Sequence, residues 1–312
     1  MTGQQDRLTE HRRNSYELWE RMAEPWQRRR ELAWRWTRPV SEWLVERLDP
    51  RPGQTVLDLA AGTGETGFLA AERLGQEGRL ISSDFSREMV LAAERVAQEL
   101  GVANADFRVI DAERIELDDQ SVDGVLCRFS YMLVAEPLRA LRETRRVLRP
   151  GGRVAFSTWG EPARNPWMTF SARLMIERGL MEPLSSDGPG VFALPDAETI
   201  GPLLAEAGFG QVEIDEMELG FRFEDADELW VFASELQGPV ALAIAKLDDA
   251  ERHDVRAAIE ERAAEFATGD GYELPGLSIK SSPTELRPVA SRAAQRTAGR
   301  GMRCPLRRSP RR

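Results

Sequence analysis

Cysteine and histidine are scarce in this sequence, and this scarcity limits the chemistry that the chain supports. Among 312 residues there are two cysteines, Cys127 and Cys304, and two histidines, His11 and His253. Two cysteines form neither a disulfide framework nor a zinc site, so we expect no bound metal. We expect the chain to work in a reducing compartment, the cytoplasm.

Long apolar runs are also missing. No stretch of about 18 apolar residues occurs, so no transmembrane segment is expected. The stretch from Met1 to Arg13 is polar and mixed in charge, which does not fit a secretory signal. With 42% hydrophobic and 30% charged residues, the composition is typical of a globular chain.

Positive charge is sparse in the body of the chain and dense at its end. Residues 280–312 hold ten of the 42 Lys and Arg residues but only one acid, Glu285, so the remainder is strongly acidic. Phosphate contacts need clustered basic side chains, so we expect no nucleic acid on the folded body. The composition of 280–312 predicts a basic, disordered tail. It is either an arm for nucleic acid or a membrane surface or, as we favour, an extension without a role in the fold.

Proline and glycine clusters divide the chain into four expected parts. Residues 8–48 are expected to be helical and hold five of the eight tryptophans, with breaks at Pro25 and Pro39. The four parts are an N-terminal helical cap (1–50), a central core (51–160), the remainder of the sheet with a helical insertion at about 225–270 (161–279), and the basic tail (280–312).

Buried strands alternate with amphipathic helices from residue 54 onward. The expected strands of the core are Thr55–Leu59, Arg79–Asp84, Phe107–Ile110, Ser121–Cys127 and Arg153–Ser157. Such alternation predicts an α/β, Rossmann-like fold with a seven-stranded, mostly parallel sheet and helices on both faces. Later strand segments are expected at Gln211–Phe223 and Pro275–Ile279.

The loop after the first strand carries a glycine pattern. The run Gly62-Thr-Gly64-Glu-Thr-Gly67 fits G-x-G-x-x-G, the dinucleotide fingerprint, between a strand and a helix. Asp84 ends the next strand at a suitable distance for a ribose-binding acid. Taken alone, this pattern indicates an NAD(P)-dependent oxidoreductase, which we keep as an alternative.

Asp58 argues for a different cofactor. Its carboxylate lies four residues before Gly62, where a dinucleotide would bring its pyrophosphate, and it would repel that group. S-adenosylmethionine has no phosphate but carries an ammonium and a sulfonium, so a carboxylate here attracts it. The small residues Ala60, Gly62 and Gly64 allow the backbone to approach such a ligand.

Two further acids suit the adenosine half of that cofactor. Asp84 can accept both ribose hydroxyls, and Asp111 can accept from the adenine amino group while the Ala112 N–H meets a ring nitrogen. Each acid alone could equally be a helix cap or a turn residue. Acids at the carboxyl ends of three successive strands, however, lie at the edge where open sheets bind ligands.

The motif series resembles the class I S-adenosylmethionine-dependent methyltransferases, and within them the ubiquinone/menaquinone biosynthesis (UbiE-like, methyltransferase type 11) group. The motifs that carry the resemblance are Val56–Gly64, Asp84–Met89, Asp111-Ala112 and Leu148–Gly152. It implies an enzyme that takes S-adenosylmethionine to S-adenosylhomocysteine while methylating a small molecule. The cofactor-binding residues it implies are Asp58, Ala60, Gly62, Gly64, Asp84, Phe85, Met89, Asp111, Ala112, Arg128 and Phe129.

The resemblance also implies roles within that set. Phe85 and Met89 pack against the adenosine, whereas Arg128 and Phe129 lie near the methionine moiety. Ala60 stands where many members have glycine. A protein that binds the cofactor without catalysis is the third alternative, and the oligomeric state stays open, with a dimer as one option.

No catalytic base is assigned from the sequence. Neither histidine lies beside a motif, and an amine, a carbanion-like carbon or an acidic hydroxyl would need no base. Arsenic methylation would require several thiols and is not favoured. Tyr16, Trp19 and Trp26 are candidates for a lid over the substrate, or else apolar anchors of the N-terminal helices. The helical insertion is the other candidate cover.

Overall fold

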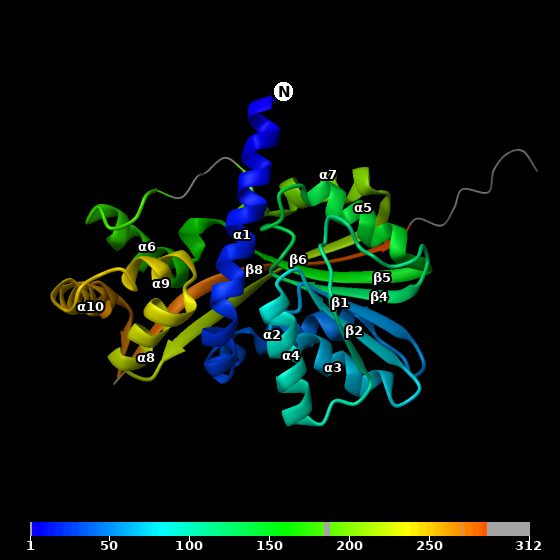
Figure 1. Cartoon of the computed structure of the whole chain (residues 1–312), viewed down its shortest axis with the longest axis horizontal. Helices are drawn as coiled ribbons and strands as arrows, with labels where there is room; N and C mark the ends of the chain where they lie inside the picture. The colour runs from blue at the N-terminus through cyan, green and yellow to red at the C-terminus, as the bar shows by residue number, and fades with distance from the viewer. Residues whose placement is uncertain (1, 184–187, 270, 286–312) are drawn as a thin grey trace, which may run out of the picture.

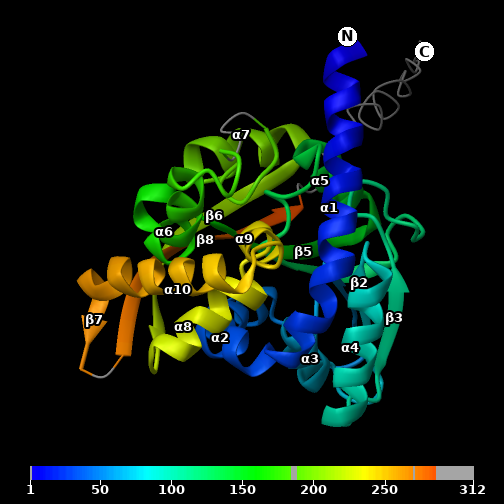
Figure 2. The same cartoon turned by 60° about the vertical axis from the view of Figure 1, so that its left-hand side comes forward.

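The structure of the chain, a computed structural model, describes residues 2–183, 188–269 and 271–285. One sheet runs through the molecule in the strand order β3-β2-β1-β4-β5-β8-β6, and its strands can be followed in Figures 1 and 2 together. The strands are β1 (Thr55–Leu59), β2 (Arg79–Asp84), β3 (Ala105–Val109), β4 (Val122–Arg128), β5 (Leu148–Trp159), β6 (Phe209–Phe223), β7 (Ala267–Thr268) and β8 (Gly271–Glu285).

The first five strands pair in parallel, and the last ones do not. β8 is antiparallel to both β5 and β6, and the two-residue β7 pairs only with β8. The predicted seven-stranded, mostly parallel sheet of Rossmann-like type is therefore confirmed, with β7 as a small addition.

Helices cover both faces of this sheet. α2 (Arg30–Leu48), α3 (Glu65–Leu74) and α4 (Arg87–Leu100) lie on one face, and α5 (Pro137–Val147) and α7 (Ala197–Ala207) lie on the other (Figure 1). The central strands are consequently buried on both sides, which is why they are near-continuous apolar runs in the sequence. Among the described residues, the helices include none with the length and apolar composition of a membrane span.

The expected proline breaks near the N-terminus are wrong. α1 (Thr2–Arg28) runs through Pro25, and α2 runs through Pro39, with the only interruption between them at Arg29. An interior proline costs a helix about 3 kcal/mol. In α2, Val40 and Leu44 are fully buried against the sheet, and burial of each such side chain contributes about 1.5–3 kcal/mol. Tertiary packing therefore outweighs the lost hydrogen bond.

The insertion between β6 and β8 is helical. It comprises α8 (Ala226–Val231), a π-helical turn (Phe232–Leu236), α9 (Pro239–Ile244) and α10 (Asp249–Ala263). The insertion and α6 (Pro166–Glu177) lie on one side of α1, and the strands β1 to β3 lie on its other side (Figures 1 and 2).

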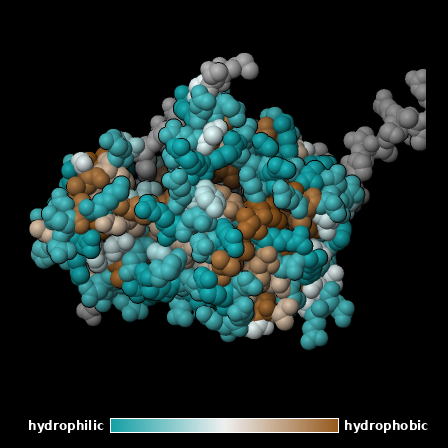
Figure 3. Space-filling view, viewed as in Figure 1, coloured by the Kyte–Doolittle hydropathy of each residue, from teal (hydrophilic) through white to brown (hydrophobic). Residues whose placement is uncertain are grey.

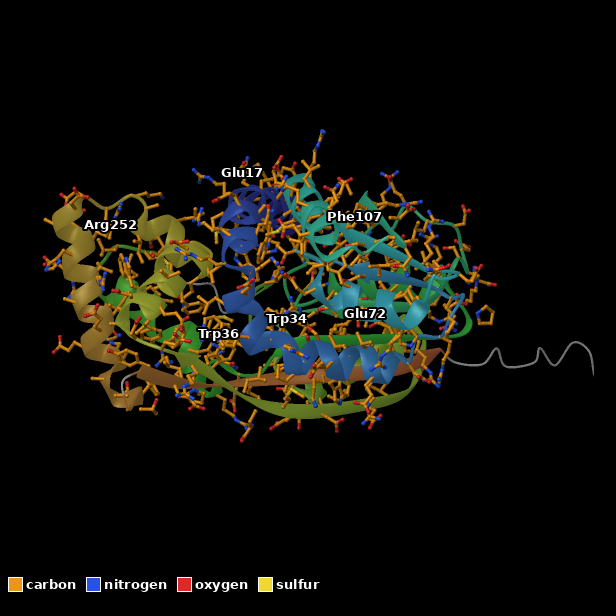
Figure 4. The ribbon with its side chains drawn as sticks, turned by 90° about the horizontal axis from the view of Figure 1, so that it is seen from below. Glu17, Trp34, Trp36, Glu72, Phe107 and Arg252 are labelled. Carbon is orange, nitrogen blue, oxygen red and sulfur yellow. The ribbon has the colours of Figure 1, made fainter. Side chains whose placement is uncertain are left out.

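An aromatic cluster joins the insertion to the sheet. Trp36 of α2 lies at its centre, 4.9 Å from the ring of Phe223 and 5.6 Å from that of Phe232 (Figure 4). The Trp36 indole N–H also donates to the carbonyl oxygen of Arg222 at 2.8 Å. Burial of these large rings, with their polar atom satisfied, fixes the insertion against the ends of the strands.

The final strand is longer than expected. β8 continues through Lys280 to Glu285, six residues past the boundary predicted for the basic tail. Lys280 is only 6% exposed, and its ammonium lies 4.6 Å from the centre of the Trp43 ring. β5 and β6 flank this segment and supply ladder hydrogen bonds on both sides, which hold a polar sequence in strand form. Residues 286–312 of the predicted tail lie outside the described residues.

Candidate cofactor site

The loop after β1 is built around the buried carboxylate of Asp58. Its Oδ2 atom accepts a hydrogen bond from the backbone N–H of Gly67 at 2.8 Å. A Cβ atom on Gly67 would lie 2.6 Å from that oxygen, so glycine is required there. The third glycine of the G-x-G-x-x-G pattern therefore accommodates an acid, and an acid in this place opposes a pyrophosphate.

The backbone of this loop enters the left-handed region three times. The φ angle is +56° at Ala60, +57° at Gly62 and +94° at Gly64. A Cβ on Gly64 would clash with the Phe68 ring, whereas a Cβ on Gly62 would meet no atom within 4 Å. Gly62 thus borders open space, which permits close approach of a ligand to the backbone. Ala60 adopts a conformation that glycine tolerates better.

The carboxylate of Asp84, at the end of β2, accepts hydrogen bonds from the glycine loop after β1 and from the loop after β2. It is 5% exposed; its Oδ2 accepts from the Gly62 N–H at 3.1 Å and its Oδ1 from the Ser86 N–H at 3.0 Å. Ser86 in turn caps α4 by accepting from the Met89 N–H at 3.2 Å. The structure therefore brings Asp58, Gly62 and Asp84 together at one edge of the sheet.

Negative charge is in excess at this edge. Burial raises the pKa of Asp58 to about 7, which the nearby Arg128 only partly offsets, while Glu65 and Asp84 raise it further. Burial likewise raises the pKa of Asp84 to about 6. A ligand that brings positive charge relieves this repulsion, so the site suits an ammonium or sulfonium group.

Glu65 is a site residue that sequence reasoning missed. It is the first residue of α3 and 7% exposed. Its Oε2 accepts from the Thr63 hydroxyl at 2.7 Å, but its Oε1 is buried with no hydrogen-bond partner among the described residues. The signal in the sequence is an acid directly after the glycine loop, at the start of the segment that follows the first strand.

Arg128 and Phe129 extend the site to the end of β4. The Arg128 guanidinium lies 6.0 Å from the centre of the Phe129 ring. Phe129 has a φ of +57°, and its ring stacks on Trp159 of β5 at 3.7 Å and 10°. Trp159 is buried, so the half-buried Phe129 is the ring of this pair that remains partly accessible.

Asp111 and Ala112 lie in the turn that follows β3. Asp111 is exposed after β3, and its Oδ1 accepts from the Glu113 N–H at 2.8 Å within a turn. Ala112 is buried. Glu113 follows, only 4% exposed, and its Oε1 accepts from the Glu136 N–H at 2.7 Å.

Helix α1 crosses the carboxyl edge of the sheet and rests on the loop after β2. Tyr16 meets the ring of Phe85 edge-on at 6.0 Å. Glu20 accepts from the Ser86 hydroxyl at 2.8 Å and from the Glu88 N–H at 3.2 Å. A small apolar cluster closes this contact: Met22, Ala23 and Met89 are buried in it, and Leu18, Trp19 and Trp26 pack around them.

The first turns of α1 also reach the loops after β3 and β4. Arg12 donates to Glu113 at 2.6 Å and to Glu136 at 2.5 Å. The His11 Nε2 atom lies 2.7 Å from the Leu133 carbonyl oxygen, which can only accept, so this nitrogen donates. Hydrophobic side chains gather on the surface beside α1, on the side toward α4 (Figure 3). α1 therefore covers the edge at which the acids converge.

Two other side chains with reactive groups, Tyr131 and Cys127, are buried in the core. The Tyr131 hydroxyl lies 2.6 Å from that of Thr144 in the core, and burial raises the pKa of Tyr131. Cys127 lies within β4, and burial raises the pKa of its thiol. His253 is on α10, in the insertion.

Comparison with known proteins identifies methyltransferase relatives. Residues 50–182 match a family described as a methyltransferase domain. The chain is 31% identical over 182 residues to the ubiquinone/menaquinone biosynthesis C-methyltransferase UbiE of Hydrogenovibrio crunogenus, spanning 54% of this chain and 71% of that one. It is 35% identical over 163 residues to an arsenite methyltransferase of Halobacterium salinarum, spanning 52% of this chain but only 39% of that one.

Solved structures show the same fold. The YcgJ protein of Bacillus subtilis superposes with a TM-score of 0.52 at 18% identity, covering 78% of this chain and 97% of that one. A Haemonchus contortus phosphoethanolamine N-methyltransferase, solved with S-adenosylhomocysteine, gives 0.50 at 17% identity over 80% of this chain and 53% of that one.

The family match and the UbiE relative show that the chain is a class I methyltransferase, an enzyme that uses S-adenosylmethionine as its methyl donor. Within that class, the chain belongs to the UbiE-like family.

Proposed function

We propose that the cofactor binds across the carboxyl edge of the sheet, with its adenosine over β2 and β3. In this arrangement Asp84 accepts from the ribose hydroxyls and Asp111 from the adenine amino group, while Phe85 and Met89 contact the adenosine. The observation that carries the proposal is the buried excess of carboxylates, Asp58 foremost, in a loop whose Gly62 borders open space. This combination favours a cationic adenosyl ligand over a dinucleotide.

We further propose that α1 is the lid of this site. Its contacts with Phe85 and with the Met89 cluster place Tyr16, Trp19 and Trp26 beside the residues assigned to the adenosine. Trp19 and Trp26 also meet each other edge-on at 5.7 Å, so they anchor the helix as well as cover the site.

When bound, S-adenosylmethionine supplies a sulfonium methyl group that is already activated for displacement. The work left to the protein is alignment of the acceptor and exclusion of water, and such proximity can provide most of the rate enhancement. Phe129, supported from behind by the buried Trp159, aligns the acceptor on one side, and α1 excludes water from above.

The acceptor is a small, apolar molecule whose reacting atom is nucleophilic without a protein base. His11 is the histidine nearest this edge in the described chain, and its Nε2 is engaged by the Leu133 carbonyl oxygen. Chemistry like that of the arsenite relative is disfavoured, because Cys127 is buried with a raised pKa and thiolates are the reactive form. A carbon acceptor, as the word C-methyltransferase in the name of the UbiE relative states for that protein, fits the apolar ring of Phe129 best.

A mass-spectrometric acceptor screen tests this proposal. The protein and S-adenosylmethionine are incubated with quinols, phenols, amines, lipids and arsenite, and products heavier by one methylene unit are sought. We expect methylation of a quinol or another ring-containing acceptor. Methylation of arsenite, or no product from any class despite bound cofactor, would contradict the proposed acceptor chemistry.

A further inference from the structure

The carboxylate of Glu20, on α1, is bound to the first turn of α4. Its Oε1 atom accepts from the Ser86 hydroxyl at 2.8 Å and from the Glu88 N–H at 3.2 Å. The side chain is partly buried, and these two donors are its hydrogen-bond partners among the residues that the structure describes. Because the start of a helix carries partial positive charge, a carboxylate in this place holds α1 on α4.

Ser86 is fully buried and connects Glu20 with Asp84. Its hydroxyl oxygen accepts from the Met89 N–H at 3.2 Å, and its hydroxyl proton is donated to Glu20. Its backbone N–H donates to the Oδ1 atom of Asp84 at 3.0 Å. The carboxylates of α1 and β2 are therefore bound by the same residue, one by its hydroxyl and the other by its amide.

Two carboxylates held this close repel each other. Burial raises the pKa of Asp84 to about 6, and the charge of Glu20 raises it further. A carboxylate has about four acceptor sites, so the N–H groups of Gly62 and Ser86 leave room on Asp84 for more donors. Each further donor stabilises the charged form of Asp84 and offsets part of the repulsion from Glu20.

The ribose hydroxyls are those further donors in the proposed function, on which this inference rests. We propose that Glu20 is a positioning residue of the cofactor site: acting through Ser86, it couples the docking of α1 to the hydrogen bonds between Asp84 and the ribose. Donors from the ribose lower the cost of placing the Glu20 carboxylate beside Asp84, so a bound ribose favours the docked helix. By linkage, the docked helix favours the bound ribose to the same extent.

Calorimetric titration with two ligands tests this coupling: S-adenosylhomocysteine and its dideoxy analogue, which lacks both ribose hydroxyls. We expect the wild type to prefer S-adenosylhomocysteine by about tenfold or more, since hydrogen bonds to a charged group are lost with the hydroxyls. We expect Glu20→Ala to reduce this preference by about fivefold. Glu20→Gln keeps an acceptor for Ser86 and Glu88 but removes the charge, so it should reduce the preference similarly.

Hydrogen exchange at the start of α4 gives a second, independent measurement. The Glu88 N–H donates to Glu20, so its protection from exchange reports whether α1 is docked. We expect S-adenosylhomocysteine to slow this exchange by about fivefold in the wild type, and the dideoxy analogue to have little effect. In Glu20→Ala the two ligands should leave the exchange rate alike.

A matched control lies one turn earlier on the same helix. Glu17 is an exposed acid of α1 (Figure 4), and Glu17→Ala removes the same charge from the helix without removing a contact to Ser86 or Glu88. This variant should keep the wild-type preference between the two ligands and the wild-type exchange rates. Should Glu20→Ala fail to fold, Glu20→Gln carries the same test, because it retains both hydrogen bonds to α4.

The outcomes separate the coupling from the proposed function. If Glu20→Ala weakens both ligands equally, Glu20 is only an anchor of α1, and if it weakens neither, Glu20 has no part in binding; either result overturns the coupling and leaves adenosyl binding intact. Equal affinity of the wild type for the two ligands would instead overturn the proposed role of Asp84. Failure of the wild type to bind S-adenosylhomocysteine would overturn the proposed function itself.

Discussion

At the scale of single residues, the strongest prediction concerns Asp58. We expect Asp58→Asn to weaken S-adenosylmethionine binding by about tenfold, because the neutral amide keeps an acceptor for the Gly67 N–H but removes the charge that attracts the ligand. Calorimetric measurement of Kd checks this, with Asp118→Asn, an exposed acid away from the loop, as the control. An unchanged Kd would leave the fold assignment standing but refute the charge argument.

Ala60 provides a second residue-scale prediction. Its φ of +56° lies in the left-handed region, where a Cβ atom is strained. We expect Ala60→Gly to relieve that strain and raise the free energy of unfolding by about 0.5–1 kcal/mol, net of the added freedom of the unfolded chain. Chemical denaturation measures the change; a loss of stability would show that the alanine methyl group has a favourable contact.

Sequence reasoning found the residues at strand ends more readily than their partners. Asp58, Asp84 and Asp111 follow strands whose apolar runs are plain in the sequence, so their convergence at one edge follows from parallel pairing. Glu65 was missed because its importance lies in an unpartnered oxygen, which depends on packing and not on spacing.

At the scale of elements, α1 is the part whose role depends most on long-range contacts. Arg12 joins it to Glu113 and Glu136, and Glu20 joins it to the start of α4. These partners are separated by 66 to 124 residues in the chain, so no local sequence pattern predicts the contacts between them. The uninterrupted course of both N-terminal helices through their prolines was likewise decided by burial.

If α1 is the lid, its release should govern the rate at which the product leaves. We expect Arg12→Ala to increase the dissociation rate of S-adenosylhomocysteine by about five- to tenfold, since it removes the ion pair to the buried Glu113. Stopped-flow displacement measures this rate. Arg13→Ala is the neighbouring control, because Arg13 is exposed and only approaches Glu10 at 3.9 Å. Equal rates for both variants and the wild type would show that α1 does not gate the site.

At the scale of the whole molecule, the buried acids make stability depend on pH. Asp58 and Asp84 have folded pKa values of about 7 and 6, above the ordinary 3.8, so the folded state binds their protons more tightly than the unfolded state. Their stabilising contribution is therefore fully present below about pH 4 and is lost progressively until the pH passes the folded pKa values of about 6 and 7.

The direction of this pH dependence can be tested by comparing the Asp58→Asn variant with the wild type. We expect the Tm of Asp58→Asn to rise relative to that of the wild type between about pH 5 and about pH 8, because only the wild type acquires a buried charge over this range. Thermal unfolding without ligand at both pH values checks this. A Tm difference that stays constant or shrinks with rising pH would mean that Asp58 is not the titrating group.

The overall architecture was predictable because periodicity and turn residues specify most elements of the core nearly to their ends; β5 differs, since it begins at Leu148, five residues before the predicted start at Arg153. The exception at the carboxyl end is instructive: the polar segment from Lys280 to Glu285 is strand because β5 and β6 flank it. Its own composition favours disorder, so only its neighbours in the sheet determine its conformation.

The central claim is that this edge of the sheet binds an S-adenosyl cofactor and not a dinucleotide. Parallel titration of the wild-type protein with S-adenosylhomocysteine and with NADH tests it most directly. We expect one molecule of S-adenosylhomocysteine to bind per chain and NADH to show no binding. Binding of NADH without S-adenosylhomocysteine would contradict the account.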